Sequence, residues 1–358
     1  MDSPLIYYLS YVNTTHLITL GIGIFSVLYI LINRPLREKK SKTFWITLAI
    51  GILILYRLAM QPIGWGTGGD RENYAYSIIF SDAASLDGIS GRTDPLFILL
   101  TAIIFGLSDI DGFFWGIATI YVGLYFLSAK RLAGNRQLWM FIAFILSLGF
   151  LAYGYNTIRA GLAVSFMLLG ITYSEKKLPV AIVLMILSLN VHMSMIIPIS
   201  MFLISKFLPR PRVFFALWII SIPVSFFAGD FFNNLFTVFS DQERTQYLLG
   251  DTEVYKIGFR IDFILYSLVP LVIGFYYIYR RKFKSALYKN IYNTYVLTNI
   301  FWILVIRANF TDRFAYLSWF LIPVLLVYPL LREPGIVRKP DIWLASIIGG
   351  ETIFSFFF

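Results

Sequence analysis

The 358-residue sequence contains no cysteine and only two histidines, and charged residues make up only 14% of it. Without cysteine the chain forms no disulfide, no thiolate metal site and no cysteine nucleophile. A soluble domain usually carries about a quarter charged residues, so this chain has too few polar groups to cover a surface in water. These absences exclude a secreted soluble enzyme, a soluble nucleic-acid-binding protein and a disordered tail.

Apolar residues make up 58% of the sequence and gather in long runs. Many runs reach about 17–20 residues, the length that crosses a bilayer core. No basic segment precedes the first run, so we expect no cleaved signal peptide. The sequence predicts an all-α polytopic membrane protein with about 12 transmembrane helices in one transmembrane domain, residues 1–358. The predicted spans are 16–33, 43–60, 113–129, 138–155, 160–174, 178–191, 194–208, 213–228, 260–279, 290–306, 314–331 and 341–358.

One apolar stretch, Pro95–Leu107, is too short for an ordinary span and fits a re-entrant or interfacial helix. Asp94 is predicted to cap this helix, with Pro95 as its first residue. Two longer outer segments, about 61–94 and 229–259, mix aromatic with polar residues. Short helices on the membrane surface and plain loops fit these two segments equally well.

Most of the 30 lysine and arginine residues lie in six clusters. Short loops rich in Lys and Arg stay in the cytoplasm, so the net charge of +10 reports membrane topology and not a nucleic-acid partner. With every cluster on the cytoplasmic side, both termini face outward. The clusters are Arg34, Arg37, Lys39, Lys40 and Lys42; Lys130, Arg131 and Arg136; Lys176 and Lys177; Lys206, Arg210 and Arg212; Arg280, Arg281, Lys282, Lys284 and Lys289; and Arg332, Arg338 and Lys339.

The remaining basic residues fall at or near the outer side, where positive-inside bias does not explain them. Arg159 opens an apolar helix, Arg307 and Arg313 flank an outer turn, and His192 separates two apolar helices. A single arginine at such a place commonly snorkels to the headgroups. Three arginines and a histidine on one face favour a shared functional site. The full set is Arg57, Arg71, Arg92, Arg159, Arg244, Lys256, Arg260, Arg307 and Arg313.

Guanidinium groups bind phosphate oxygens through a rigid fork and keep their charge, which suits a lipid-linked diphosphate. Fixed cations also stabilise the negative charge that develops when a diphosphate leaves a sugar carbon. His192 or Asp70 could accept the proton of an attacking hydroxyl, and Asp70 fits a structural pair with an arginine equally well. Arg92 fits an anion contact or a local pair with Asp94. No tight metal-ligand spacing is present, so we expect neither a metal nor a cofactor.

Five stretches of the sequence resemble the EpsG-like branch of the Wzy-type polysaccharide (O-antigen) polymerases. They span about residues 64 to 325 in the family's order. They are GGDRENYAYSIIF at 68–80, RTDPLFILL at 92–100, NTIRAGLAVSFMLLG at 156–170, LNVHMSMII at 189–197 and RANFTDRFAYLSWFLIP at 307–323.

The resemblance implies a multi-pass glycosyltransferase related to the C-type enzymes, in the bacterial cytoplasmic membrane. It would transfer a glycan from undecaprenyl diphosphate to a hydroxyl of an incoming lipid-linked repeat unit, at a site facing the periplasm or exterior. Its partners would be these lipid-linked donor and acceptor oligosaccharides, the bilayer and a chain-length regulator, with no nucleic acid. The resemblance implies these roles: diphosphate binding by Arg159, Arg307, Arg313 and Arg92, and proton abstraction by His192 or Asp70. Tyr74 and Asn156, in the same stretches, are the predicted substrate contacts.

Two other functions use the same arginines. A transporter or flippase of lipid-linked sugars would form no glycosidic bond, and it is typically built from repeats with broken helices, which this sequence does not show. An O-antigen ligase shares the donor, but a much longer outer loop than 229–259 would favour it.

Overall fold

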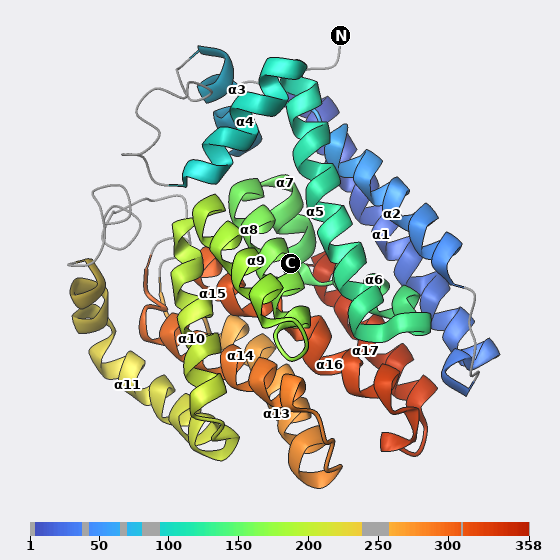
Figure 1. Cartoon of the computed structure of the whole chain (residues 1–358), viewed down its shortest axis with the longest axis vertical. Helices are drawn as coiled ribbons and strands as arrows, with labels where there is room; N and C mark the ends of the chain where they lie inside the picture. The colour runs from blue at the N-terminus through green and yellow to red at the C-terminus, as the bar shows by residue number, and fades with distance from the viewer. Residues whose placement is uncertain are drawn as a thin grey trace. The chain divides into compact units, whose positions relative to one another are not determined.

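The computed structural model describes residues 4–37, 43–64, 70–80, 94–237, 258–308 and 311–357, and within these ranges it is helical and contains no strand. The chain divides into two compact units, which are described separately: residues 1–195 with 327–358, and residues 196–326. Figure 1 labels their helices along the chain.

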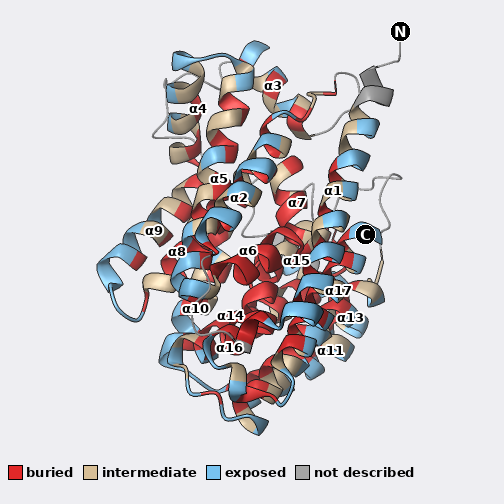
Figure 2. Cartoon of the chain, turned by 90° about the vertical axis from the view of Figure 1, so that its right-hand side faces the viewer, coloured by how far each residue is buried: buried red, intermediate tan, exposed pale blue. Residues whose placement is uncertain are grey.

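The first unit contains helices from both ends of the chain. They are α1 (Pro4–Asn33), α2 (Phe44–Ala59), α3 (Asp70–Phe80), α4 (Pro95–Leu107), α5 (Ile110–Ala133), α6 (Gln137–Ile145), α7 (Leu148–Tyr155), α8 (Ile158–Tyr173), α9 (Leu178–Val191) and α17 (Pro340–Phe357), with short 3-10 turns at Pro35–Arg37, Gly134–Arg136, Met193–Met195 and Pro334–Ile336. Helix α1 packs along α17, α5 packs on α2 and α8, and α4 packs on α5 and α9. Every residue of α6 is buried, so α6 lies in the core of this unit (Figure 2).

The second unit contains α10 (Ile196–Phe207), α11 (Pro211–Thr237), α13 (Ile261–Phe275) with a π-helical turn at Tyr276–Arg280, α14 (Ala286–Leu304), α15 (Thr311–Trp319) and the first residues of α16 (Ile322–Arg332). A buried polar network joins four of these helices. The Asn299 side chain accepts a hydrogen bond from Trp218 Nε1 at 2.5 Å and donates to the hydroxyls of Ser267 and Ser318, each at 3.1 Å. Buried polar groups need partners, so this network specifies how the helices pack.

The apolar runs predicted the helices well. Each predicted span coincides with one helix or with two consecutive helices, and Pro95–Leu107 is itself helix α4. Two predicted spans are broken. Segment 138–155 is interrupted at Ser147, whose backbone is extended, and segment 314–331 is interrupted before Ile322. Pro323 explains the second break, because proline has no N–H for the preceding turn and clashes with the carbonyl four residues earlier.

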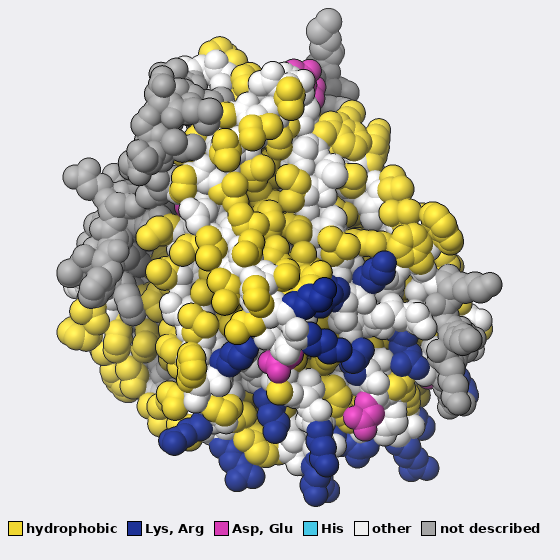
Figure 3. All heavy atoms as spheres, viewed as in Figure 1, with side chains coloured by type: hydrophobic (Ala, Val, Ile, Leu, Met, Phe, Trp, Pro, Cys, Tyr) yellow, Lys and Arg dark blue, Asp and Glu magenta, His cyan; other side chains and the backbone are white. Residues whose placement is uncertain are grey.

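Length and composition support a membrane protein. Among the described residues, five helical stretches are long and apolar enough to cross a bilayer: Tyr8–Asn33, Ile110–Ile145, Pro211–Phe232, Ile261–Arg280 and Thr311–Arg332. Large apolar side chains also face outward, among them Phe25, Ile32 and Trp45, which are 69%, 76% and 74% exposed. Hydrophobic side chains likewise dominate the surface over α4 and α5 (Figure 3). Such surfaces suit lipid and not water. The count of 12 crossings and the single domain remain predictions.

The outer segments are described in part. Residues 70–80 form the helix α3, and residues 229–237 continue α11 past a kink at Ala228, where the backbone leaves the helical region. Residues 65–69, 81–93 and 238–257 of these segments lie outside the described residues.

Candidate functional site

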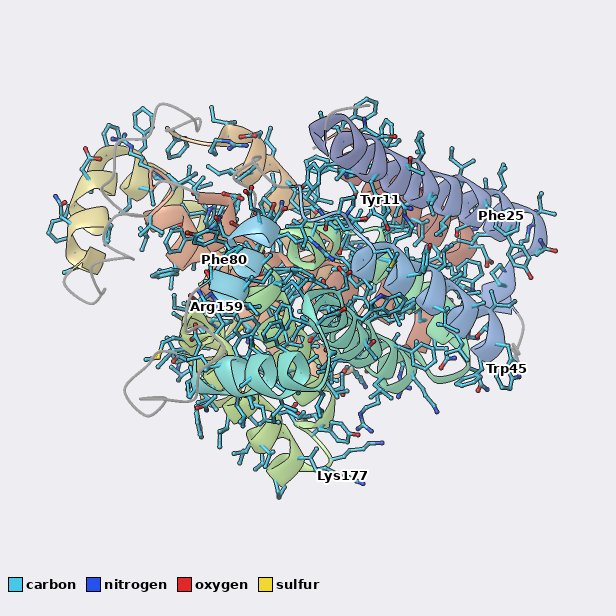
Figure 4. The ribbon with its side chains drawn as sticks, turned by 90° about the horizontal axis from the view of Figure 1, so that it is seen from above. Tyr11, Phe25, Trp45, Phe80, Arg159 and Lys177 are labelled. Carbon is cyan, nitrogen blue, oxygen red and sulfur yellow. The ribbon has the colours of Figure 1, made fainter. Side chains whose placement is uncertain are left out.

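Helices α8 and α9 form an antiparallel hairpin that places Arg159 and His192 at the same end of the first unit. Arg159 is the second residue of α8, and His192 directly follows α9. Gly170 allows the close approach near the turn, since a Cβ there would lie 3.3 Å from the Ala181 carbonyl oxygen. Nearer the other end, the Ser188 hydroxyl donates to the Ala163 carbonyl at 2.7 Å. Figure 4 shows Arg159 well apart from Lys177, which projects from the turn.

Asp94 joins Arg159 and His192. Helix α4 begins at Pro95 as predicted, but the predicted cap is wrong because the Asp94 side chain makes no capping hydrogen bond. Its carboxylate instead lies 3.0 Å from Arg159 Nη1 and 3.3 Å from His192 Nδ1, and it accepts a hydrogen bond from the Met193 N–H at 2.7 Å. Asp94 is therefore the centre of a cluster built from α4, α8 and the end of α9.

The electrostatics of the cluster keep Asp94 ionised. The side chain of Asp94 is only 2% exposed, and this burial by itself raises the pKa of the carboxyl. Four contacts act in the opposite direction and together hold the pKa of Asp94 below its ordinary value. They are the hydrogen bond with His192, the charge of His192, the charge of Arg159 and the hydrogen bond from the Met193 N–H. The ionised Asp94 carboxylate therefore holds two side chains in place, the positively charged Arg159 and the titratable His192.

Arg159 is the most accessible member of the cluster, with 39% of its side chain exposed. Its Nη1 is used by Asp94, while its Nε is buried and has no hydrogen-bond partner among the described residues. The guanidinium carbon lies 6.0 Å from the centre of the Phe97 ring, and Phe97 in turn contacts the ring of Tyr74 at 5.8 Å between centroids. A predicted substrate contact on α3 is thereby brought next to the cluster.

The other predicted site residues of the first unit are placed less closely. Asn156 is exposed at the break between α7 and α8, three positions before Arg159. Asp70 is the half-buried first residue of α3. Arg92 lies outside the described residues.

Two further arginines of the first unit bind protein groups. Arg57 stacks on the Tyr11 ring at 3.6 Å and donates to the Tyr11 carbonyl and the Thr15 hydroxyl, which ties α2 to α1. Arg71 is buried, lies 3.6 Å from the centre of the Phe114 ring and donates to the carbonyls of the last two residues of α2. Burial lowers the pKa of Arg71 to about 10, so it is still charged at neutral pH.

In the second unit, Arg307 contacts α11. Its Nη2 donates to the Phe226 carbonyl at 2.8 Å, and its Nη1 lies 3.5 Å from the Asp230 carboxylate. Arg313 lies in the first turn of α15, where its charge and that of Arg260 both act on the Asp312 carboxyl. Arg260, which we did not predict as a site residue, also forms a bidentate pair with Asp262, with Nε donating to Oδ1 and Nη2 to Oδ2.

The basic connections of the first unit meet at one end. Arg136 donates to the carbonyls of Leu331 and Leu36, and the Leu36 N–H donates to Asp341. These contacts bring together the segments that follow α1 and α5 and the end of α16. Arg131, also in the second basic cluster, bonds Thr172 at the end of α8. Because Arg159 lies in the first turn of α8, the candidate cluster and these basic residues lie at opposite ends of that helix.

Similarly, two basic clusters of the second unit adjoin each other, since the Arg212 guanidinium lies 4.6 Å from the centre of the Tyr279 ring. Tyr279 directly precedes the Arg280 cluster.

As for metals, no group of three or more His, Asp or Glu side chains suited to an ion occurs in the part of the chain that the structure describes.

Comparison with known proteins identifies a family. The model of the EpsG family, whose members are Wzy-like polysaccharide polymerases, matches residues 50–348. No curated protein and no solved structure matches significantly. The matched region contains Asp94, Arg159 and His192, together with Arg307 and Arg313. Because the match covers most of the sequence, the chain belongs to the EpsG family.

Proposed function

We propose that the protein is a polysaccharide polymerase. It transfers a glycan from undecaprenyl diphosphate to a hydroxyl of an incoming lipid-linked repeat unit, on the outer face of the bacterial cytoplasmic membrane. The EpsG match supports the polymerase class. The observation that carries the proposed chemistry is the joint placement of Arg159 and His192 on Asp94, with Arg159 still accessible to a ligand.

The reaction needs an anion-binding group and a base. The acceptor hydroxyl attacks the anomeric carbon of the donor glycan, and the new C–O bond forms as the bond to the diphosphate breaks. The hydroxyl proton passes to His192, and the diphosphate leaves with the bonding electrons. Arg159 stabilises the charge that develops on the diphosphate, since a guanidinium is suited to phosphate oxygens.

Other residues have supporting roles in this proposal. Tyr74 offers a sugar-stacking ring, as its contact with Phe97 beside Arg159 suggests. Asn156 is an exposed polar group near Arg159. Asp70 is the alternative base. Arg92, Arg307 and Arg313 are further proposed diphosphate ligands. Arg307 also lies 3.5 Å from the Asp230 carboxylate.

The proposal is tested with purified protein and a defined lipid-linked repeat unit, followed by mass analysis of the products. We expect products lengthened by whole repeat units, and we expect Arg159→Ala and His192→Ala each to abolish lengthening while the protein remains inserted. Arg57→Lys is the matched control, because Arg57 binds only protein groups among those described. Transport of the lipid without bond formation would identify a flippase, and transfer only to a lipid A core would identify a ligase.

A further inference from the structure

The His192 imidazole is held between two polar groups. Its Nδ1 lies 3.3 Å from Asp94 Oδ2, and its Nε2 lies 3.2 Å from the Ser194 hydroxyl. Which ring nitrogen carries the proton depends on these partners. The contacts with Asp94 and Ser194 therefore indicate which nitrogen can act as a base.

Asp94 can only accept a hydrogen bond. Its Oδ1 accepts from the Met193 N–H, and its Oδ2 forms the pair with Arg159, which are the partners of an ionised carboxylate. Nδ1 of a neutral His192 must then carry the ring proton in order to bond Asp94. Nε2 keeps its lone pair and accepts from the Ser194 hydroxyl.

The backbone at Asp94 is a second observation. Asp94 adopts a left-handed conformation, with φ of 64°, directly before a proline. This region is unfavourable for residues with a Cβ, although aspartate tolerates it better than most, and the following proline restricts the residue further. Such conformations persist where surrounding contacts over-determine them, and they cluster at functional sites. Here the contacts with Arg159, His192 and Met193 hold the carboxylate in place.

We propose that Asp94 is a positioning residue that holds His192 in its Nδ1–H tautomer, so that Nε2 accepts the proton of the acceptor sugar's hydroxyl. This inference rests on the proposed function, in which His192 is the base. Arg159, paired with the same carboxylate, is fixed relative to the imidazole, so one anion orders both the base and the diphosphate ligand. The acceptor O–H bond breaks, its proton goes to Nε2, and its oxygen bonds the anomeric carbon.

Ser194 has a defined part in this arrangement. Its hydroxyl bonds Nε2 in the free protein and so lies where an acceptor hydroxyl would bind. In this arrangement the Ser194 hydroxyl occupies the position of the acceptor hydroxyl until the acceptor binds and displaces it. It is neither a nucleophile nor a proton relay, so its removal leaves the tautomer and the base intact.

The tautomer can be measured without any activity. The sequence has only two histidines, so a His16→Gln variant labelled with ¹⁵N-histidine reports on His192 alone. In detergent near neutral pH we expect one protonated, pyrrole-type nitrogen at Nδ1 and one unprotonated, pyridine-type nitrogen at Nε2. Asp94→Asn in the same background should yield a mixture of tautomers or the reverse one, because an amide can donate to Nδ1. A His192 signal with the proton on Nε2, or on both nitrogens, in the parent protein would overturn the assignment.

Kinetics supply the second test. Asp94→Asn should lower kcat at least 100-fold with KM for the lipid-linked acceptor changed less than about threefold, as expected when a general base loses its orientation. Asp94→Glu, which restores a carboxylate, should recover part of kcat. Ser194→Ala should lower kcat much less than Asp94→Asn does, because it leaves the Nδ1–H tautomer in place.

Equal losses in Asp94→Asn and Ser194→Ala would refute Nε2 as the direct proton acceptor, and an unchanged kcat in Asp94→Asn would refute the positioning role. Failure of the proposed function is recognised separately. In that case the parent protein forms no polymer, while the NMR spectrum still reports the tautomer.

Discussion

Arg159→Lys separates ligand binding from folding at the candidate site. Arg159 uses Nη1 for Asp94, and 39% of its side chain is exposed, so phosphate oxygens can reach the outer part of the guanidinium. Lysine keeps the positive charge and can still pair with Asp94, but it loses the planar fork. We therefore expect Arg159→Lys to fold normally and to bind a lipid diphosphate more weakly.

The size of the effect follows from the hydrogen bonds lost. A hydrogen bond to a charged group contributes about 1.5–3 kcal/mol, which corresponds to a roughly 10- to 150-fold weaker Kd. Arg159→Ala should weaken binding at least as much and should also lower Tm, because it leaves the buried Asp94 without its guanidinium. That stability loss should stay near 1 kcal/mol, since Arg159 is 39% exposed and water screens the pair.

The assay is titration of the detergent-purified variants with farnesyl diphosphate, a short prenyl diphosphate, alongside thermal unfolding. Arg57→Lys is the control. It loses the stacking on Tyr11 and should lower Tm without changing Kd. An Arg159→Lys protein whose Kd equals that of the parent would refute the assignment of Arg159 as a diphosphate ligand.

Two further outcomes concern stability. The pKa of Asp94 is lowered in the folded protein, so its ionic contacts contribute stability above the ordinary carboxyl value of about 3.9, and this contribution is lost as pH falls through the folded-state pKa. The Tm advantage of the parent over Asp94→Asn should accordingly be constant near neutral pH and shrink below about pH 4, and an advantage independent of pH would contradict the ion pairing. Gly170→Leu should reduce the amount of folded protein, because its Cβ already approaches Ala181 O at 3.3 Å and the larger side chain must separate α8 from α9. Size-exclusion profiles of Gly170→Leu and, as a control at an open position, Gly123→Leu would test this, and equal profiles would refute the close packing.

Helix positions were largely predictable because they depend on local sequence. The apolar runs predicted α2, α8 and α9 within about two residues of their ends, and Pro95 predicted the start of α4. The break at Ser147 was not predicted, because no proline marks it and the apolar run continues through it. The break after Trp319 had a usable signal in Pro323.

The site was predictable only in part. Arg159 and His192 were found because polar groups at the ends of apolar helices are conspicuous. Arg57, in the last turn of the apolar helix α2, is conspicuous for the same reason, yet it binds the Tyr11 ring and the Tyr11 carbonyl. Asp94 looked like a helix cap, which is the usual role of an aspartate before Pro at the first helical position.

Composition and periodicity alone determined that this protein is a helical membrane protein, because the length of an apolar run and the sparsity of charge are properties of the linear chain. Tertiary structure decided which charged groups meet. Asp94 and His192 are 98 residues apart in sequence, and only the packing of α4 against the α8–α9 hairpin brings them to 3.3 Å. A contact at that separation is specified by how the intervening helices pack, so no local sequence pattern predicts it.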